Sequence, residues 1–324
     1  MQFSAIGDEM LTVEASRAKL LRHLVGAPDV TFIRSWGNVG DQLIYAGTRR
    51  LLADIPYVEV GLKDLSGAGG HTAVLSGGGA WCQPWHADLP DALPVLESRF
   101  KRVIIFPSSF DVSVQAVRKA LSNTKALVFA RERVSYQQIH GLCTADIAHD
   151  CAFFFDYSPY LHTGEGLLRA YRTDKESALG ECPSQNRDIS ATCDSLDQWL
   201  WMIARHESIE TDRAHVMIAA ALLGKQVEYQ ASSYHKVPAI AQFSLRDYPV
   251  RRQAAQLRDT FPRQDGHIDE LPPRADTQTP RYRDVLEAIE RDLGRGRPSP
   301  NFVTVARIAA KLLLDRYGVR GGSQ

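Results

Sequence analysis

The sequence lacks the features that mark a membrane-spanning, secreted or disulfide-bonded protein. No apolar run is long enough to cross a bilayer. Residues 1–10 have no basic start followed by an apolar core, so we expect no secretory signal. The five cysteines are an odd number without a C-x-x-C pair, which argues against a disulfide framework or a zinc site and for a reducing cytoplasm. We therefore expect a cytoplasmic protein, and the sequence shows no cluster of residues with metal-ligand spacing.

Charge of one sign is not in excess either. The 38 Lys and Arg residues balance 38 Asp and Glu residues, so no global field favours nucleic acid as a partner. The G-x-G-x-x-G and Walker phosphate motifs are missing. What is present, 44% hydrophobic and 23% charged residues in a chain of 324, is typical of a soluble globular protein with room for two domains.

Short apolar runs alternate with segments of helical periodicity along most of the chain. This alternation predicts an α/β fold with parallel sheets covered by helices. The pattern loosens at 156–166, where we place a boundary. The predicted domains are an N-terminal α/β domain at 1–160, a second at 161–270, and a helical tail at 271–324. The strands predicted from the runs are 30–33, 58–60, 72–76, 102–106, 126–130, 167–172, one near 189, and 226–229.

Glycine-rich or polar segments follow several of these strands. Asn38 to Asp41 forms a loop with Gly40 before a helix, and Gly77 to Gly79 follows the strand at 72–76. Ser108 and Arg131 come directly after two further strands. Ligands of parallel sheets bind at the carboxyl ends of the strands. We therefore expect these four segments to form one site.

Residues 210–225 read as a single helix with a marked start and end. Thr211 or Asp212 is the expected N-cap, and Gly224 the expected left-handed residue after the last turn. Arg213 and His215 then lie in the first turn, where free amides favour an anion. From the spacing alone, a surface position for this pair is the commoner outcome.

The last third of the chain carries fewer signals. Residues 246–280 contain several prolines and charges and are predicted as loop, followed by helices near 281–293 and 302–317. The basic residues of this tail favour a solvated helix packed on the body over a contact with a membrane surface.

An ordered set of segments resembles the polysaccharide pyruvyltransferase family. The segments cover about residues 30–245, although Ala80 and Ala214 stand where the family often has Asn and Leu. They are Gly37-Asn38-Val39-Gly40-Asp41-Gln42-Leu43-Ile44, Gly77-Gly78-Gly79, Ala130-Arg131-Glu132-Arg133-Val134-Ser135, His149-Asp150-Cys151-Ala152-Phe153, Thr211-Asp212-Arg213-Ala214-His215 and Ser232-Ser233-Tyr234-His235-Lys236-Val237.

This resemblance implies two facing Rossmann-like domains, similar to a GT-B-type glycosyltransferase, with the acceptor on the side of the domain at 1–160 and phosphoenolpyruvate on the side of the domain at 161–270. It implies transfer of the enolpyruvyl group of phosphoenolpyruvate to a sugar of an exopolysaccharide or other cell-surface glycan precursor, with a lipid-linked acceptor at the inner membrane face. The reaction forms a pyruvate ketal and releases phosphate.

The resemblance implies no metal and no cofactor, since phosphoenolpyruvate is a substrate, and it implies that His215 is the acid. Arg213 and Arg131 are the candidates for holding the anionic groups, because a guanidinium can bind an oxyanion through two hydrogen bonds. Asp41, beside the glycine loop, is expected either to orient or deprotonate a sugar hydroxyl or only to cap its helix. The expected substrate-binding residues are Asn38, Gly40, Gly78, Gly79, Ser232, His235 and Lys236.

Two other functions fit the same architecture. A glycosyltransferase that uses a nucleotide sugar shares the predicted fold, and fold alone does not separate the two. A non-catalytic relative that binds a sugar or a protein is the third reading. The presence of both Arg213 and His215 favours pyruvyl transfer over these two.

Overall fold

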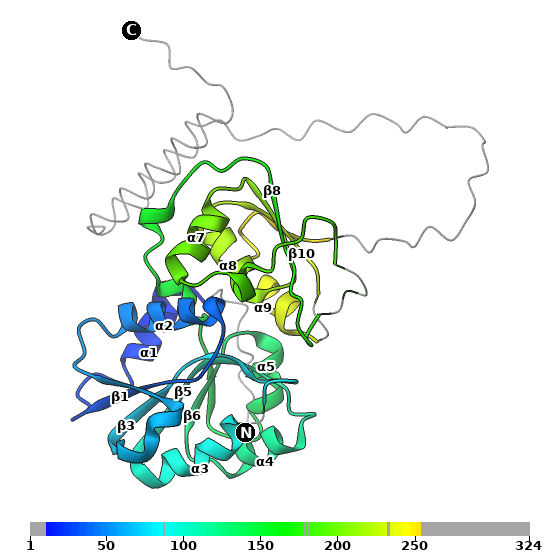
Figure 1. Ribbon diagram of the computed structural model, residues 1–324. Coiled ribbons are helices and arrows are strands. Elements are labelled where there is room, and N and C mark those ends of the chain that lie inside the picture. The colour runs from blue at the N-terminus through cyan, green and yellow to red at the C-terminus, as the bar shows by residue number, and fades with distance from the viewer. Residues whose placement is uncertain (1–10, 87, 178, 180–181, 232–233, 254–324) are drawn as a thin grey trace, which may run out of the picture. The chain divides into compact units, whose positions relative to one another are not determined.

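A computed structural model describes residues 11–253, except 87, 178, 180, 181, 232 and 233. The predicted tail at 271–324, with its two helices, lies outside the described residues, as does most of the predicted loop at 246–280. All the residues that are described belong to one compact unit. That unit contains two parallel sheets, shown in Figure 1.

The first sheet is built from residues 30–147 and has seven strands. Its order is β2-β1-β3-β5-β6-β7, and β4 pairs with the end of β5. Every pairing is parallel, as the alternation of strands and helices requires. The strands are β1 (Val30–Arg34), β2 (Val58–Gly61), β3 (Gly70–Leu75), β4 (Gly78–Trp81), β5 (Phe100–Phe110), β6 (Leu127–Ala130) and β7 (Ala145–Ile147).

Helices cover this sheet, and most follow the predicted periodicity. Leu93 and Leu96 from one helix pack with Val117 and Leu121 from another in a core beneath the sheet. The helices are α1 (Val13–Leu21), α2 (Val39–Leu51), α3 (Leu89–Arg99), α4 (Gln115–Asn123) and α5 (Arg133–Ile139), with 3-10 turns η1 (Leu62–Gly67), η2 (Cys151–Phe154) and η3 (Ser158–Tyr160).

The second sheet has four parallel strands in the order β11-β10-β9-β8. Its helices carry the largest apolar cluster, which contains Trp199, Met217 and Ile240. The elements are β8 (Leu167–Ala170), α6 (Ile189–Thr192), α7 (Leu196–Ala204), β9 (Ser208–Thr211), α8 (Ala214–Leu222), β10 (Gln226–Tyr229), α9 (Lys236–Ser244) and β11 (Val250–Arg252).

Four sequence predictions in the second sheet were wrong. The predicted helix from 210 begins only at Ala214, because residues 208–211 alternate in burial and pair as strand β9. Thr211 does not cap the helix; its hydroxyl donates to the Ala170 carbonyl across the sheet, at 2.8 Å. The predicted strand near 189 is the short helix α6, and residues 250–252 of the predicted loop pair with β10. Gly224 does adopt the left-handed conformation, with φ of +72°.

Helix α2 joins the two sheets. Its residues Val39 and Leu43 are buried in the core of the second sheet together with Trp199. Figure 1 shows α2 between the first sheet and the helices α7 and α8. One turn after Leu43, Gly47 lies against η2 so closely that a Cβ there would stand 1.8 Å from the Cys151 carbonyl oxygen. Because Gly47 has no side chain, α2 can pack closely against η2.

None of the helices among the described residues combines the length and the apolarity needed to cross a membrane.

We expect Gly47→Ala to lower the free energy of unfolding by about 1–3 kcal/mol, because α2 must move away from η2 to admit the methyl group. Gly141→Ala is the control, since a Cβ at Gly141 has no atom within 4 Å. Urea denaturation followed by circular dichroism measures both. Equal stability of the two variants would contradict the close packing of α2.

Candidate functional site

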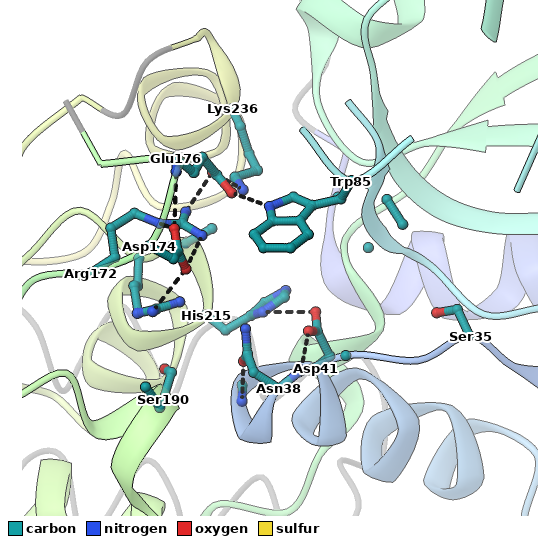
Figure 2. A pocket seen from close by; sticks show the side chains of 18 of the residues that line it. Ser35, Asn38, Asp41, Trp85, Arg172, Asp174, Glu176, Ser190, His215 and Lys236 are labelled. Atoms are coloured by element: carbon teal, nitrogen blue, oxygen red, sulfur yellow. Dashed lines mark hydrogen bonds and ion pairs between the residues drawn. The ribbon is translucent and has the colours of Figure 1, made fainter. Parts of the chain in front are cut away.

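A pocket of about 270 Å³ lies at the carboxyl ends of strands from both sheets. Its walls carry four basic side chains and four carboxylates, so the pocket is polar without a large excess of positive charge. Figure 2 shows it from close by. It is lined by Ser35, Trp36, Gly37, Asn38, Gly40, Asp41, Gly77, Gly78, Gly79, Ala80, Trp85, Arg131, Arg172, Thr173, Asp174, Glu176, Asp188, Ser190, Ala191, Arg213, Ala214, His215 and Lys236.

The N-terminus of α2 forms one wall. Asn38 caps the helix by accepting from the Gly40 amide at 2.8 Å, and the Asp41 carboxylate accepts from the Asn38 amide at 2.9 Å. These two bonds make a capping box. A Cβ at Gly40 would lie 3.3 Å from the Cβ of His215, so glycine permits the close approach of the second sheet's helix α8. Asp41 thus has a capping role, and its second oxygen faces His215.

The glycine triplet enters strand β4 and forms the floor. Gly78 has φ of +134°, a conformation that side chains rarely adopt. A Cβ on Gly79 would lie 3.4 Å from Lys236 Nζ and 3.5 Å from Arg131 Nη2. The missing side chain at Gly79 therefore leaves open the space where two cationic groups meet.

Arg131 follows β6 and is 1% exposed. Its Nη1 donates to Asp150 at 2.8 Å and its Nε donates to the Ser109 hydroxyl at 2.8 Å. Burial opposes the charge, but the Asp150 carboxylate raises the pKa of Arg131 above its usual value. Its Nη2 is buried and has no hydrogen-bond partner. A buried donor without an acceptor is costly, which makes this nitrogen a position for a ligand oxygen.

His215 lies in the first turn of α8, between groups from the first sheet. Its Nε2 is 3.3 Å from Arg131 Nη1 and 3.8 Å from the Asp150 carboxylate. Its Nδ1 is 3.6 Å from the Asp41 carboxylate. Burial would raise the pKa of Asp150, but the interaction with His215 and the charge of Arg131 outweigh it and hold that pKa well below its usual range. The ring therefore has a carboxyl group on each side, Asp41 near Nδ1 and Asp150 near Nε2.

Arg213 does not face the pocket as an unpaired cation. Its Nε and Nη2 each donate to Asp188 at 2.6 Å, and Nη2 also reaches Asp174 at 3.1 Å. Arg172, two residues after the end of β8, donates to Asp174 at 2.7 Å and 3.0 Å and lies 2.6 Å from Glu176. The two arginines and three carboxylates form a network on the second-sheet side of the pocket.

Glu176 links this network to the opposite wall. Its carboxylate accepts from the Trp85 indole Nε1 at 3.0 Å and from Lys236 Nζ. Figure 2 shows the Trp85 indole reaching across the pocket toward Glu176. Burial lowers the pKa of Lys236, although Glu176 counteracts it. Burial also opposes ionisation of Glu176, but Lys236 and Arg172 lower its pKa.

Most of the predicted site residues lie together. The predicted residues that line the pocket are Asn38, Gly40, Asp41, Gly78, Gly79, Arg131, Arg213, His215 and Lys236. Ser108 is buried behind it, with its hydroxyl donating to the Phe106 carbonyl at 2.8 Å. His235 does not line the pocket; its Nε2 lies 3.5 Å from Glu132. Ser232 lies outside the described residues.

The sequence analysis did not select several residues that build the site. Arg172 had a usable signal, because it is the last residue of the predicted strand at 167–172 and so stands at a carboxyl end. Asp150 was part of the family resemblance but had no assigned role. The other residues lie in segments without a motif: Trp36, Trp85, Asp174, Glu176, Asp188 and Ser190.

Comparisons with known proteins agree with this architecture. A family model described as polysaccharide pyruvyl transferase matches residues 38–227. No curated protein matches the chain. One similar solved structure is an uncharacterised protein from Klebsiella pneumoniae subsp. pneumoniae NTUH-K2044, with a TM-score of 0.64 and 23% identity over 76% of this chain and 100% of that chain. The likeness confirms the predicted α/β fold with parallel sheets.

Asp212 lies behind the pocket between β9 and α8 and is 1% exposed. One carboxylate oxygen accepts from the Arg172 amide at 2.8 Å, and the other has no hydrogen-bond partner. Burial raises the pKa of Asp212 to about 6. A raised pKa for an acid means that the folded protein binds this proton more tightly than the unfolded chain. Stability from this group is therefore lost as the pH rises from about 4 to about 6.

We expect the substitution Asp212→Asn to abolish this loss of stability as the pH rises. The variant and the native protein should be equally stable near pH 4, and at pH 7 the variant should be more stable by up to about 3 kcal/mol, because a tenfold change in proton affinity corresponds to about 1.4 kcal/mol. Urea denaturation at several pH values measures the difference. A stability gap that does not change with pH would refute the assignment.

Proposed function

This chain belongs to the polysaccharide pyruvyl transferase family, and from that premise we propose that it transfers the enolpyruvyl group of phosphoenolpyruvate to a saccharide and forms a pyruvate ketal. The observation that carries the proposal is the meeting of Arg131 Nη2, Lys236 Nζ and the His215 ring in one pocket. An enol phosphate needs oxyanion donors and a nearby acid, and these groups supply both.

The donor's anionic groups would bind over Gly79. The unpartnered Nη2 of Arg131 donates to one oxygen, and Lys236 provides a second positive charge there. Because Lys236 is already paired with Glu176, a donor oxygen has to take the place of that carboxylate. Arg213 has its Nε and Nη2 bound to Asp188, so it acts as a positioning residue that fixes the start of α8.

In the proposed first chemical step, His215 acts as the acid between two carboxylates. In its imidazolium form the ring has Asp41 beside Nδ1 and Asp150 beside Nε2, at 3.6 Å and 3.8 Å. His215 protonates the methylene carbon of the donor while a sugar hydroxyl attacks the neighbouring carbon and gives its proton to Asp41. Transfer of that proton from Asp41 to His215 restores both groups.

The second bond completes the ketal. An adjacent hydroxyl of the same sugar attacks the same carbon as the bond to the phosphate oxygen breaks. Inorganic phosphate leaves with the pair of electrons of that bond, and the hydroxyl proton goes to phosphate or solvent. One phosphoenolpyruvate and one diol thus yield one ketal and one phosphate. We place the acceptor, an exopolysaccharide or other surface glycan precursor, on the side of the pocket formed by the first sheet.

The donor site is tested by thermal unfolding with phosphoenolpyruvate and, in parallel, with a panel of nucleotide sugars. A ligand at about a hundred times its dissociation constant stabilises by about 2.7 kcal/mol, a shift of several degrees. We expect phosphoenolpyruvate to give this shift. Stabilisation by a nucleotide sugar in its place would favour a glycosyltransferase.

The variant Gly79→Ala tests whether phosphoenolpyruvate binds over Gly79. Its methyl group is at ordinary contact distance from Lys236 and Arg131, so the fold should be retained while the space for an oxyanion is filled. We expect the dissociation constant for phosphoenolpyruvate to rise at least about tenfold, equivalent to about 1.4 kcal/mol. Gly141→Ala serves again as the control. If Gly79→Ala binds phosphoenolpyruvate with unchanged affinity, the donor does not bind over Gly79.

His215→Ala separates binding from chemistry. We expect phosphate release from phosphoenolpyruvate, in the presence of a mixed saccharide acceptor, to fall by about a hundredfold to ten-thousandfold, while stabilisation by phosphoenolpyruvate persists. Circular dichroism checks the fold. Substantial remaining turnover would contradict the role of His215 as the acid.

A further inference from the structure

A second cavity, of about 490 Å³, adjoins the pocket. The two cavities share the wall formed by Ser35, Trp36 and Gly37, directly after β1. The second is lined in addition by Arg34, Gln42, Tyr45, Arg49 and Leu196. The two cavities are therefore neighbours, and both are in contact with this segment.

The shared wall is rigid. The Tyr45 hydroxyl donates to the Ser35 carbonyl at 2.8 Å, and the Ser35 amide donates to the Ser76 hydroxyl at 2.9 Å. The hydroxyls of Ser35 and Ser76 are also 2.9 Å apart. These bonds fix the backbone from which the Trp36 side chain projects.

Trp36 leaves a large apolar surface in water. It is 41% exposed, although its neighbour Ser35 is buried. Burying an indole face against a ligand is favourable, and the C–H groups on one face of a pyranose ring provide a flat apolar partner of matching size. Trp36 therefore suits the face of a sugar ring.

Of the remaining wall residues, Gln42, Arg34 and Arg49 provide donors for sugar oxygens, whereas the Tyr45 hydroxyl is already bonded to Ser35. Gln42, Tyr45 and Arg49 are three and four residues apart and lie on one face of α2. Arg49 donates to Glu59 through Nε and Nη2, at 2.8 Å and 2.7 Å, and Arg34 Nε is 2.5 Å from the same carboxylate.

Two guanidinium groups thus share one acid, and further N–H groups remain for a ligand. A guanidinium can only donate, so the ligand must present oxygen acceptors. Arg34 also lies over the Tyr45 ring, 5.9 Å from its centroid, which holds the cluster in place.

We propose that this second cavity binds the sugar residue adjacent to the one that is modified, with its ring against Trp36 and its oxygens bonded to Arg34 and Arg49. This inference rests on the proposed function, since it takes the acceptor to be a saccharide. It implies that the acceptor contains at least two sugar residues. Neutral sugars and sugars with a carboxylate share the required chemistry, because both offer oxygen acceptors.

Saturation-transfer NMR on the full chain tests the cavity without requiring turnover. The probes are methyl β-D-glucopyranoside, the neutral disaccharide cellobiose and the acidic disaccharide cellobiouronic acid. Arg49 lines only the second cavity, so Arg49→Gln should weaken binding of disaccharide and leave binding of monosaccharide unchanged. We expect a disaccharide to bind at least about tenfold more tightly than the monosaccharide, and Trp36→Ala to remove this difference.

Val95→Ala is the matched control, because Val95 is 42% exposed and lines neither cavity. If cellobiouronic acid binds more tightly than cellobiose, the neighbouring sugar is acidic. If the two disaccharides bind with equal affinity, the neighbouring sugar is neutral. Disaccharides that bind no better than the monosaccharide, or not at all, overturn the proposal. The thermal unfolding measurement with phosphoenolpyruvate tests the proposed function independently. If only this cavity is misassigned, phosphoenolpyruvate still stabilises the protein. If the disaccharide preference is found but phosphoenolpyruvate does not stabilise the protein, the proposed donor is wrong.

Discussion

The buried ion pair between Arg131 and Asp150 is the interaction on which the site depends. Both side chains are 1% exposed, and removal of one partner from such a pair leaves an uncompensated charge that costs about 3–5 kcal/mol. The pair also orients what surrounds it. Asp150 fixes Nη1 of Arg131, Ser109 fixes Nε, and only Nη2 is left toward the pocket. His215 from the second sheet rests against both members of the pair.

Much of the site could be predicted from the sequence because it follows from topology. The carboxyl ends of neighbouring parallel strands meet at one edge, so the Asn38 loop, the glycine triplet and Arg131 had to lie together. The role of Arg213 could not be predicted in the same way. Its partners Asp174 and Asp188 come from the segment between β8 and α6, where no periodicity or motif constrains the path. The start of helix α8 was predicted too early, because strand β9 at residues 208–211 is too short to show strand periodicity in the sequence.

The balance of charge in the pocket shapes how an anion would bind. Arg172, Arg213 and Lys236 are already paired with carboxylates, so a ligand meets few unpaired positive groups among the described lining residues. Binding of an anion at Lys236 is then an exchange of one carboxylate partner for another. Ligand size and shape decide such an exchange more than long-range attraction does, because the net charge at the site is small.

The contact at Gly40 has a consequence for the protein as a whole. Here the first turn of α2 touches the first turn of α8, so the distance between Asp41 and His215 depends on how the two sheets are packed against each other. Each half carries part of the machinery and neither contains the site. The space around His215 is therefore bounded by both sheets, and any change in their packing changes its shape.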